Sequence, residues 1–229
     1  MHHPVILHIE TSTNVCSVAL SEGNQCLFNI SNDEGLNHAA LLSTFVDKAL
    51  NVLKKQQKKL DAIAVSGGPG SYTGLRIGVS TAKGLCYGFD IPLIEVNTLK
   101  TLCTAAFKAT EKKDEMLFCP MIDARRMEVY AAIYDAESNV LKPVSADIID
   151  ESSYSDLLSQ HRIRFFGNGA DKCKSVLTHS NALFFDNLTP LAENMIELAL
   201  TAFENKKFAD VAYYEPFYLK EFQPTTPKK

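Results

Sequence analysis

A glycine-rich segment, residues 66–78, has the residue types of an anion-binding turn. It follows the apolar run 61–65 and precedes apolar residues at helical spacing, which predicts a strand, a turn and a helix start. Glycines at 67, 68 and 70 permit positive φ and close approach, and the free N–H groups of a helix start can bind an anion. The segment lacks the lysine of G-x-x-x-x-G-K-[ST] and the spacing of G-x-G-x-x-G. A tight structural turn and a phosphate cradle are both consistent with it.

Two carboxylates and a second glycine turn could complete a nucleotide site around this segment. Glu10 opens a polar turn after an apolar run, and Asp123 ends another apolar run. Carboxylate oxygens are the ligands that a magnesium ion on nucleotide phosphates prefers. The arrangement would suit a nucleotide hydrolase or a small-molecule kinase. The candidate nucleotide-loop residues, which form a degenerate version of such a site, are Glu10, Thr11, Ser12, Gly67, Gly68, Gly70, Asp123, Gly167 and Gly169.

Other reactive groups lack the neighbours that their chemistry requires. The histidines, at 2, 3, 8, 38, 161 and 179, show no metal-ligand spacing, so no metal site is predicted. Ser12, Ser66 and Ser71 have no recognisable base and acid nearby in sequence, although folding can assemble a triad from distant residues. We therefore predict no catalytic residue, and a metallopeptidase is the least supported function.

The composition favours a cytoplasmic globular protein without a general affinity for nucleic acid. The chain has 229 residues and a net charge of −4, so any RNA contact must be local or made by a partner. Arg125 with Arg126 and the lysines at 54–59 are candidates for such a contact, although a solvated turn or helix end explains each more simply. Six cysteines without a C-x-x-C pair are typical of reduced core residues. No membrane association is expected, because the N-terminal apolar run is shorter than the ~18 residues of a span.

The helix after the glycine segment carries small residues at every fourth position. Gly74, Gly78 and Ala82 form this strip, and each interior glycine costs about 1 kcal/mol relative to alanine. A smooth strip lets another backbone come close, which gains packing contacts. Two arrangements are open: the strip packs on the protein's own sheet, or it docks against a helix of another subunit.

Hydrophobic patterns predict two related α/β halves. The first has strands at 5–9, 15–20, 25–30, 61–65 and 93–96, with helices at 38–55 and after the glycine segment. The second has strands at 116–123, 128–134 and 163–166 and a helix at 189–204. Both halves begin with a hairpin that carries a carboxylate, at Glu10 and at Asp123, which indicates a weak internal repeat.

A charged break at 111–115 separates the two halves, and we predict domains at 1–99 and 100–229. The aromatic tail 213–220 should pack back on the body, because its side chains are too apolar to be left in water. The polar residues 223–229 should fray.

Five sequence blocks in the same order resemble the TsaB family, which bacteria need to make threonylcarbamoyladenosine in tRNA. The blocks span residues 6–220 and are ILHIETSTNVCSVAL, NHAALL, SGGPGSYTGLRIGVSTAKGL, IDARRMEVYAAIY and EPFYLK. The resemblance implies an α/β fold of the actin-like ATPase (ribonuclease H-like) superfamily with two domains. It also implies a non-catalytic assembly subunit that binds the catalytic paralogue TsaD and the ATPase TsaE. That complex transfers a threonylcarbamoyl group to N6 of adenosine 37 in tRNAs that read codons starting with A.

The resemblance further implies roles for single residues. ATP and metal are expected in the partner subunits, because TsaD-type paralogues place two histidines one helical turn apart, whereas here His38 is followed by Leu42. Glu10 stands where actin-like ATPases usually carry aspartate. The isolated chain is expected to form a homodimer and to meet tRNA through the complex. The expected partner-interface residues are His38, Leu41, Leu42, Phe45, Gly74, Arg76, Gly78 and Ala82.

Overall fold

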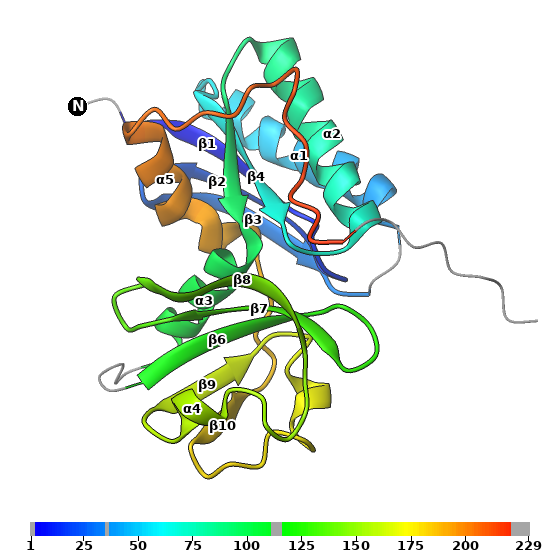
Figure 1. The fold of residues 1–229 in the computed structure, drawn as a ribbon. Coiled ribbons are helices and arrows are strands. Elements are labelled where there is room, and N and C mark those ends of the chain that lie inside the picture. The colour runs from blue at the N-terminus through cyan, green and yellow to red at the C-terminus, as the bar shows by residue number, and fades with distance from the viewer. Residues whose placement is uncertain (1–2, 35–36, 111–115, 221–229) are drawn as a thin grey trace, which may run out of the picture.

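Two five-stranded sheets with helices on their faces form the structure (Figure 1). The computed structural model describes residues 3–34, 37–110 and 116–220. The first sheet has the strand order β3-β2-β1-β4-β5. Its strands are β1 (Val5–Glu10), β2 (Cys16–Glu22), β3 (Gln25–Asn32), β4 (Ala62–Gly68) and β5 (Leu93–Asn97). The antiparallel meander predicted at the start of the chain is confirmed.

Helices cover both faces of the first sheet, which explains why β1 and β4 are apolar along most of their length. On one face lie α1 (His38–Lys55), whose predicted bounds are confirmed, and α2 (Tyr72–Phe89). On the other face lie the 3-10 helix η2 (Ala192–Met195) and α5 (Ile196–Glu204). No helix within the described ranges is long and apolar enough to cross a membrane.

The second sheet repeats the topology of the first. It has the order β10-β9-β6-β7-β8, so that β8-β7-β6-β9-β10 corresponds to β3-β2-β1-β4-β5. In each sheet three antiparallel strands are followed by two parallel ones. The strands are β6 (Met116–Asp123), β7 (Glu128–Tyr134), β8 (Val140–Ile148), β9 (Arg162–Phe166) and β10 (Ala182–Phe185). The prediction of two related halves is therefore confirmed.

The last helix of each half packs on the sheet of the other half. α3 (Thr98–Lys108) follows β5 but buries Leu99 and Leu102 against Phe118 and Phe166 of the second sheet. α5 follows β10 but buries Ala199 against the first sheet. The predicted domain 100–229 thus needs correction, because its C-terminal helix belongs to the first sheet. The predicted break at 111–115 and the residues 223–229 lie outside the described ranges.

Several elements were not predicted or begin elsewhere. The helix expected at 189–204 begins with η2 at Ala192 and becomes α-helical at Ile196. The sequence did not predict α3, β8, β10, α4 (Ser155–Leu158) or the 3-10 helix η1 (Asp171–Cys173).

The tail packs back on the body, as predicted, and follows α2 (Figure 1). Lys83 Nζ on α2 donates to Tyr214 O at 3.0 Å, and Phe217 N–H donates to Gly67 O at 2.7 Å. The ring centroid of Tyr218 lies 4.8 Å from that of Tyr72. These contacts place the tail beside the glycine segment.

Candidate functional site

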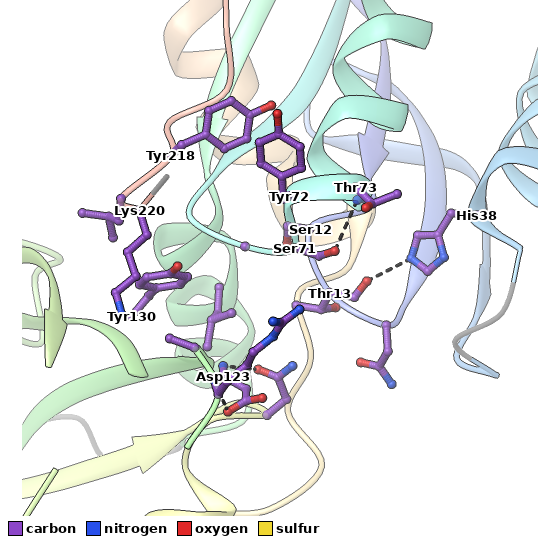
Figure 2. A pocket seen from close by; sticks show the side chains of 18 of the residues that line it. Ser12, Thr13, His38, Ser71, Tyr72, Thr73, Asp123, Tyr130, Tyr218 and Lys220 are labelled. Carbon is purple, nitrogen blue, oxygen red and sulfur yellow. Dashed lines mark hydrogen bonds between the residues drawn. The ribbon is translucent and has the colours of Figure 1, made fainter. Parts of the chain in front are cut away.

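A cleft of about 1040 Å³ opens between the two sheets (Figure 2). The turn after β1 and the start of α2 form one wall, and the β6–β7 turn forms the other, with the end of the tail beside it. Of the candidate nucleotide-loop residues, the cleft lining includes Ser12, Gly70 and Asp123. It does not include Glu10, Thr11, Gly67, Gly68, Gly167 or Gly169.

The tail covers the first two glycines of the loop. A Cβ on Gly67 would lie 2.3 Å from the Tyr214 hydroxyl oxygen. Gly68 has a φ of +112°, and a Cβ there would lie 2.7 Å from Phe217 O. Glycine is needed at both positions because the tail approaches so closely. The tight-turn interpretation is confirmed here, and an open phosphate cradle at Gly67 and Gly68 is wrong.

The small-residue strip of α2 packs inside its own subunit, against the turn after β1. A Cβ on Gly74 would lie 2.1 Å from Thr11 O, and one on Gly78 would lie 2.3 Å from Thr11 Oγ1. Thr11 Oγ1 donates to Gly74 O at 2.8 Å, which fixes the turn on the helix. Ala82 is completely buried. The prediction that Gly74, Gly78 and Ala82 face a partner is therefore wrong, because the protein's own chain occupies this strip.

The other expected partner-interface residues divide into buried and accessible ones. Leu42 and Phe45 are buried in the core beneath α1, so their assignment to an interface is also wrong. His38 is partly exposed, and its Nε2 donates to Thr13 O at 2.9 Å. Leu41 is partly exposed, and Arg76 is exposed and donates to the Tyr72 hydroxyl at 3.0 Å.

Glu10 lies beneath the cleft wall and not in the cleft. Its side chain is completely buried; Oε1 accepts from Ser12 N–H at 2.6 Å, and Oε2 has no hydrogen-bond partner. Burial raises the pKa of this carboxyl to about 7, although the side chain of Ser12, its N–H and the side chain of Ser66 oppose the shift. The alternative in which Glu10 faces a nucleotide is wrong, because the carboxyl is buried within the protein.

Asp123 faces the cleft, but it is neutralised. Its carboxylate is paired with Lys172, and its N–H donates to Asn168 Oδ1 at 3.0 Å. The nearby turn does not present its glycines to the cleft, because a Cβ on Gly167 would lie 2.4 Å from Met121 O and one on Gly169 would lie 2.8 Å from Ile122 C. These two glycines pack against β6, which corrects their assignment to a nucleotide loop.

Within residues 3–34, 37–110 and 116–220, no group of three or more His, Cys, Asp and Glu side chains could hold a metal ion. Sequence reasoning did not find Asn168 and Tyr130 as cleft residues, nor Lys172 as the ion-pair partner of Asp123. Asn168 and Lys172 lie in the segment after β9 and Tyr130 lies in β7, and no local pattern marks any of them. The Arg125-Arg126 pair was visible as a charged turn, and the structure places both residues in the cleft lining.

The chain is similar in sequence to proteins of known families. The family described as "TsaD: tRNA N6-adenosine threonylcarbamoyltransferase" matches residues 33–220. The "tRNA threonylcarbamoyladenosine biosynthesis protein TsaB" of Escherichia coli (strain K12) is 32% identical, over 94% of this chain and 94% of that protein. The chain belongs to the TsaB family. The protein of the same name from Haemophilus influenzae is 28% identical over 96% of this chain and 95% of its own length.

A solved TsaB-type structure, "YeaZ from Pseudomonas aeruginosa", has the same fold. It superposes with a TM-score of 0.78, covers 94% of this chain and 100% of its own, and is 24% identical. The predicted actin-like, ribonuclease H-like fold with two mixed sheets flanked by helices is thereby confirmed.

Proposed function

We propose that this TsaB family member is a non-catalytic assembly subunit in tRNA threonylcarbamoyladenosine biosynthesis. Its partner would be a TsaD-type paralogue that transfers a threonylcarbamoyl group to N6 of adenosine 37 in tRNAs reading codons that start with A. The names of the relatives support the pathway, and the match to the TsaD family supports a partner of similar fold. ATP and metal would be held by the partner subunits, including a TsaE-type ATPase, in the cytoplasm. The isolated chain would form a homodimer.

The observation that carries this proposal is an open glycine pair on the exposed face of α2. A Cβ on Gly84 or Gly88 would meet nothing within 4 Å. Each of these glycines costs about 1 kcal/mol of helix stability relative to alanine. Contact with Thr11 offsets this cost at Gly74 and Gly78, but no described residue makes such a contact at Gly84 or Gly88. Close approach of a partner helix would account for them.

The residues around this pair support a docking face. Arg76, Ser80 and Gly84 follow one another at four-residue spacing along α2, and all three are exposed. Tyr87, one turn further, is 88% exposed, although it is a large aromatic side chain that usually finds a partner. We therefore place the docking strip on the opposite side of α2 from the one that the sequence suggested.

The covered glycine loop supports the non-catalytic part of the proposal. Phosphate-binding loops offer free backbone N–H groups to the ligand, whereas here the tail and the turn after β1 pack on Gly67, Gly68 and Gly70.

A Gly84→Leu substitution tests the docking face. The leucine would force the two backbones apart, so the dissociation constant for the TsaD-type partner of the same organism should rise at least tenfold, equivalent to about 1.4 kcal/mol. The thermal midpoint of the isolated chain should not fall, because nothing lies within 4 Å of the new Cβ. Thr201→Leu on the exposed side of α5 is the matched control and should leave the affinity unchanged.

Two results would contradict the proposal. One is wild-type affinity of the Gly84→Leu variant for the partner, measured by calorimetry. The other is micromolar binding of Mg-ATP by the isolated wild-type chain, which would favour a nucleotide hydrolase or small-molecule kinase instead.

A further inference from the structure

The β6–β7 turn presents two arginines to the cleft. Arg125 and Arg126 are exposed and line it. The turn is fixed by hydrogen bonds from Ala124 N–H to Glu128 O and from Glu128 N–H to Arg125 O, both at 3.1 Å. The two guanidinium groups therefore project from a defined backbone position and not from a frayed end.

The two arginines give the cleft a net positive charge. Its two carboxylates are already neutralised, Asp123 by Lys172 and Glu128 by Lys220. Among the described residues, no carboxylate forms an ion pair with either arginine. A cleft with a local charge of +2 on a chain with a net charge of −4 is a specific place for an anion.

The opposite wall contains the start of helix α2. Ser12 belongs to the cleft lining, but its side chain is completely buried. The Ser12 hydroxyl lies close to the Glu10 carboxyl and lowers its pKa, so it belongs to the buried wall behind the cleft. Figure 2 shows Ser12 beside Ser71, at the start of the 18-residue helix α2, whose positive dipole end favours an anion.

An aromatic side chain lies next to the arginines. Tyr130 is partly buried, lines the cleft and lies beside Lys220 (Figure 2). Arginines that bind phosphate, next to an aromatic ring on which a base can stack, are the combination used for single-stranded RNA. The cleft volume of about 1040 Å³ is large enough for an unstacked nucleotide.

We propose that this cleft binds a single-stranded segment of RNA, with Arg125 and Arg126 on its phosphates and a base on Tyr130. The inference rests on the proposed function, since it makes the RNA a substrate tRNA of the complex. A free nucleotide is the less suitable ligand, because its polyphosphate would need the glycine loop that Phe217 and Tyr214 cover. A phosphodiester chain needs only single phosphate contacts, which an exposed arginine pair provides.

The test uses a double variant, Arg125→Gln with Arg126→Gln, in which both charges are lost and the backbone is kept. The probe is a fluorescein-labelled, unmodified tRNA transcript with adenosine at position 37, measured by anisotropy with the chain alone and with its TsaD-type partner. Binding should weaken about tenfold. The slope of log K against log salt should fall by about 1.4, because each lost single-strand phosphate contact removes roughly 0.7.

Two further variants distinguish this cleft from other surfaces of the chain that could bind RNA. Tyr130→Leu keeps an apolar side chain and should weaken binding about fivefold or more without a change in the salt slope. Lys54→Gln with Lys55→Gln removes two charges from the exposed end of α1 and should leave binding unchanged. All variants should retain the thermal midpoint and the partner affinity of the wild type.

Several outcomes would overturn the inference. One is unchanged tRNA binding by the arginine variant. Another is a loss of tRNA binding in the Lys54 and Lys55 variant alone. A third is displacement of tRNA by AMP or ATP at the same concentration as the tRNA. Loss of partner affinity in the arginine variant would show that the cleft binds protein and not RNA. Loss of RNA binding with the partner complex intact would support the inference. An RNA contact elsewhere would leave the proposed assembly function standing, because that function is measured by partner affinity alone.

Discussion

Two glycines of α2, six residues apart, should respond in opposite directions to the same substitution. In Gly78→Ala the new Cβ would lie 2.3 Å from Thr11 Oγ1, and that hydroxyl cannot move without breaking its bond to Gly74 O. In Gly84→Ala the new Cβ meets nothing within 4 Å. Both changes are made in the interior of one helix, so their helix propensities cancel in the comparison.

The magnitudes follow from three effects. Overpacking costs about 1–3 kcal/mol, and the lost Thr11 hydrogen bond costs about 1 kcal/mol more. The gain in helix propensity returns about 1 kcal/mol at either site. Gly78→Ala should therefore lower the free energy of unfolding by about 2 kcal/mol, and Gly84→Ala should raise it by about 1 kcal/mol. For a domain of this size these values correspond to shifts of roughly −4 to −8 °C and +2 to +4 °C in the thermal midpoint.

Scanning calorimetry at two protein concentrations measures both shifts and separates them from self-association, which would make the midpoint depend on concentration. The packing argument fails if Gly78→Ala is as stable as the wild type. It also fails if Gly84→Ala loses stability at both concentrations, because that helix face would then have a contact within the subunit.

Two further predictions concern buried or partly buried carboxyl groups. Burial raises the pKa of Glu10 from 4.5 to about 7, so the stability of the wild type should fall as pH rises through this window. In Glu10→Gln this fall should be absent. Measured by urea titration, the stability of the variant relative to the wild type should rise by about 3 kcal/mol between pH 4.5 and 7.5. Burial alone would raise the pKa of Asp147, but hydrogen bonds from Lys142 and Tyr154 lower it overall. Asp147→Asn should therefore lower the free energy of unfolding by about 1–3 kcal/mol near neutral pH. The difference from the wild type should vanish as pH falls through the lowered pKa of Asp147. A difference that stays constant down to acidic pH would count against the assigned contacts.

Elements with a strong local pattern were predictable from the sequence. The apolar stripe of α1 and the apolar runs of β6 and β7 have the bounds that the sequence indicated. α3 and β8 were not found, for different reasons. α3 is short and mostly buried, and only Lys100, Thr104 and Lys108 give it a narrow polar stripe. β8 is an edge strand that contains Pro143 and mixes partly buried with exposed residues, which obscures the alternation of a strand.

The exchange of the two terminal helices could not be predicted, because it depends on contacts between distant segments. Nothing in the sequence of α5 says that Ala199 packs on β1 and β5 and not on the strands that precede it. The lining of the cleft also depends on contacts between distant segments. The alternative nucleotide site grouped Asp123 with a glycine turn, but the neutralisation of Asp123 by Lys172, 49 residues later, is a property of the fold.

The angle of each glycine about the axis of α2 indicates its role, although the four-residue spacing alone does not. At about 100° per residue, Leu75, Val79, Ala82 and Cys86 define the direction of the core, and all four are buried. Gly78 lies about 70° from that direction, at the flank of the buried stripe, whereas Gly84 lies about 170° away. A small residue at the flank can admit a neighbouring turn of the same chain, as Thr11 shows. One that lies opposite the core leaves space for another molecule, which is what the proposed docking face requires.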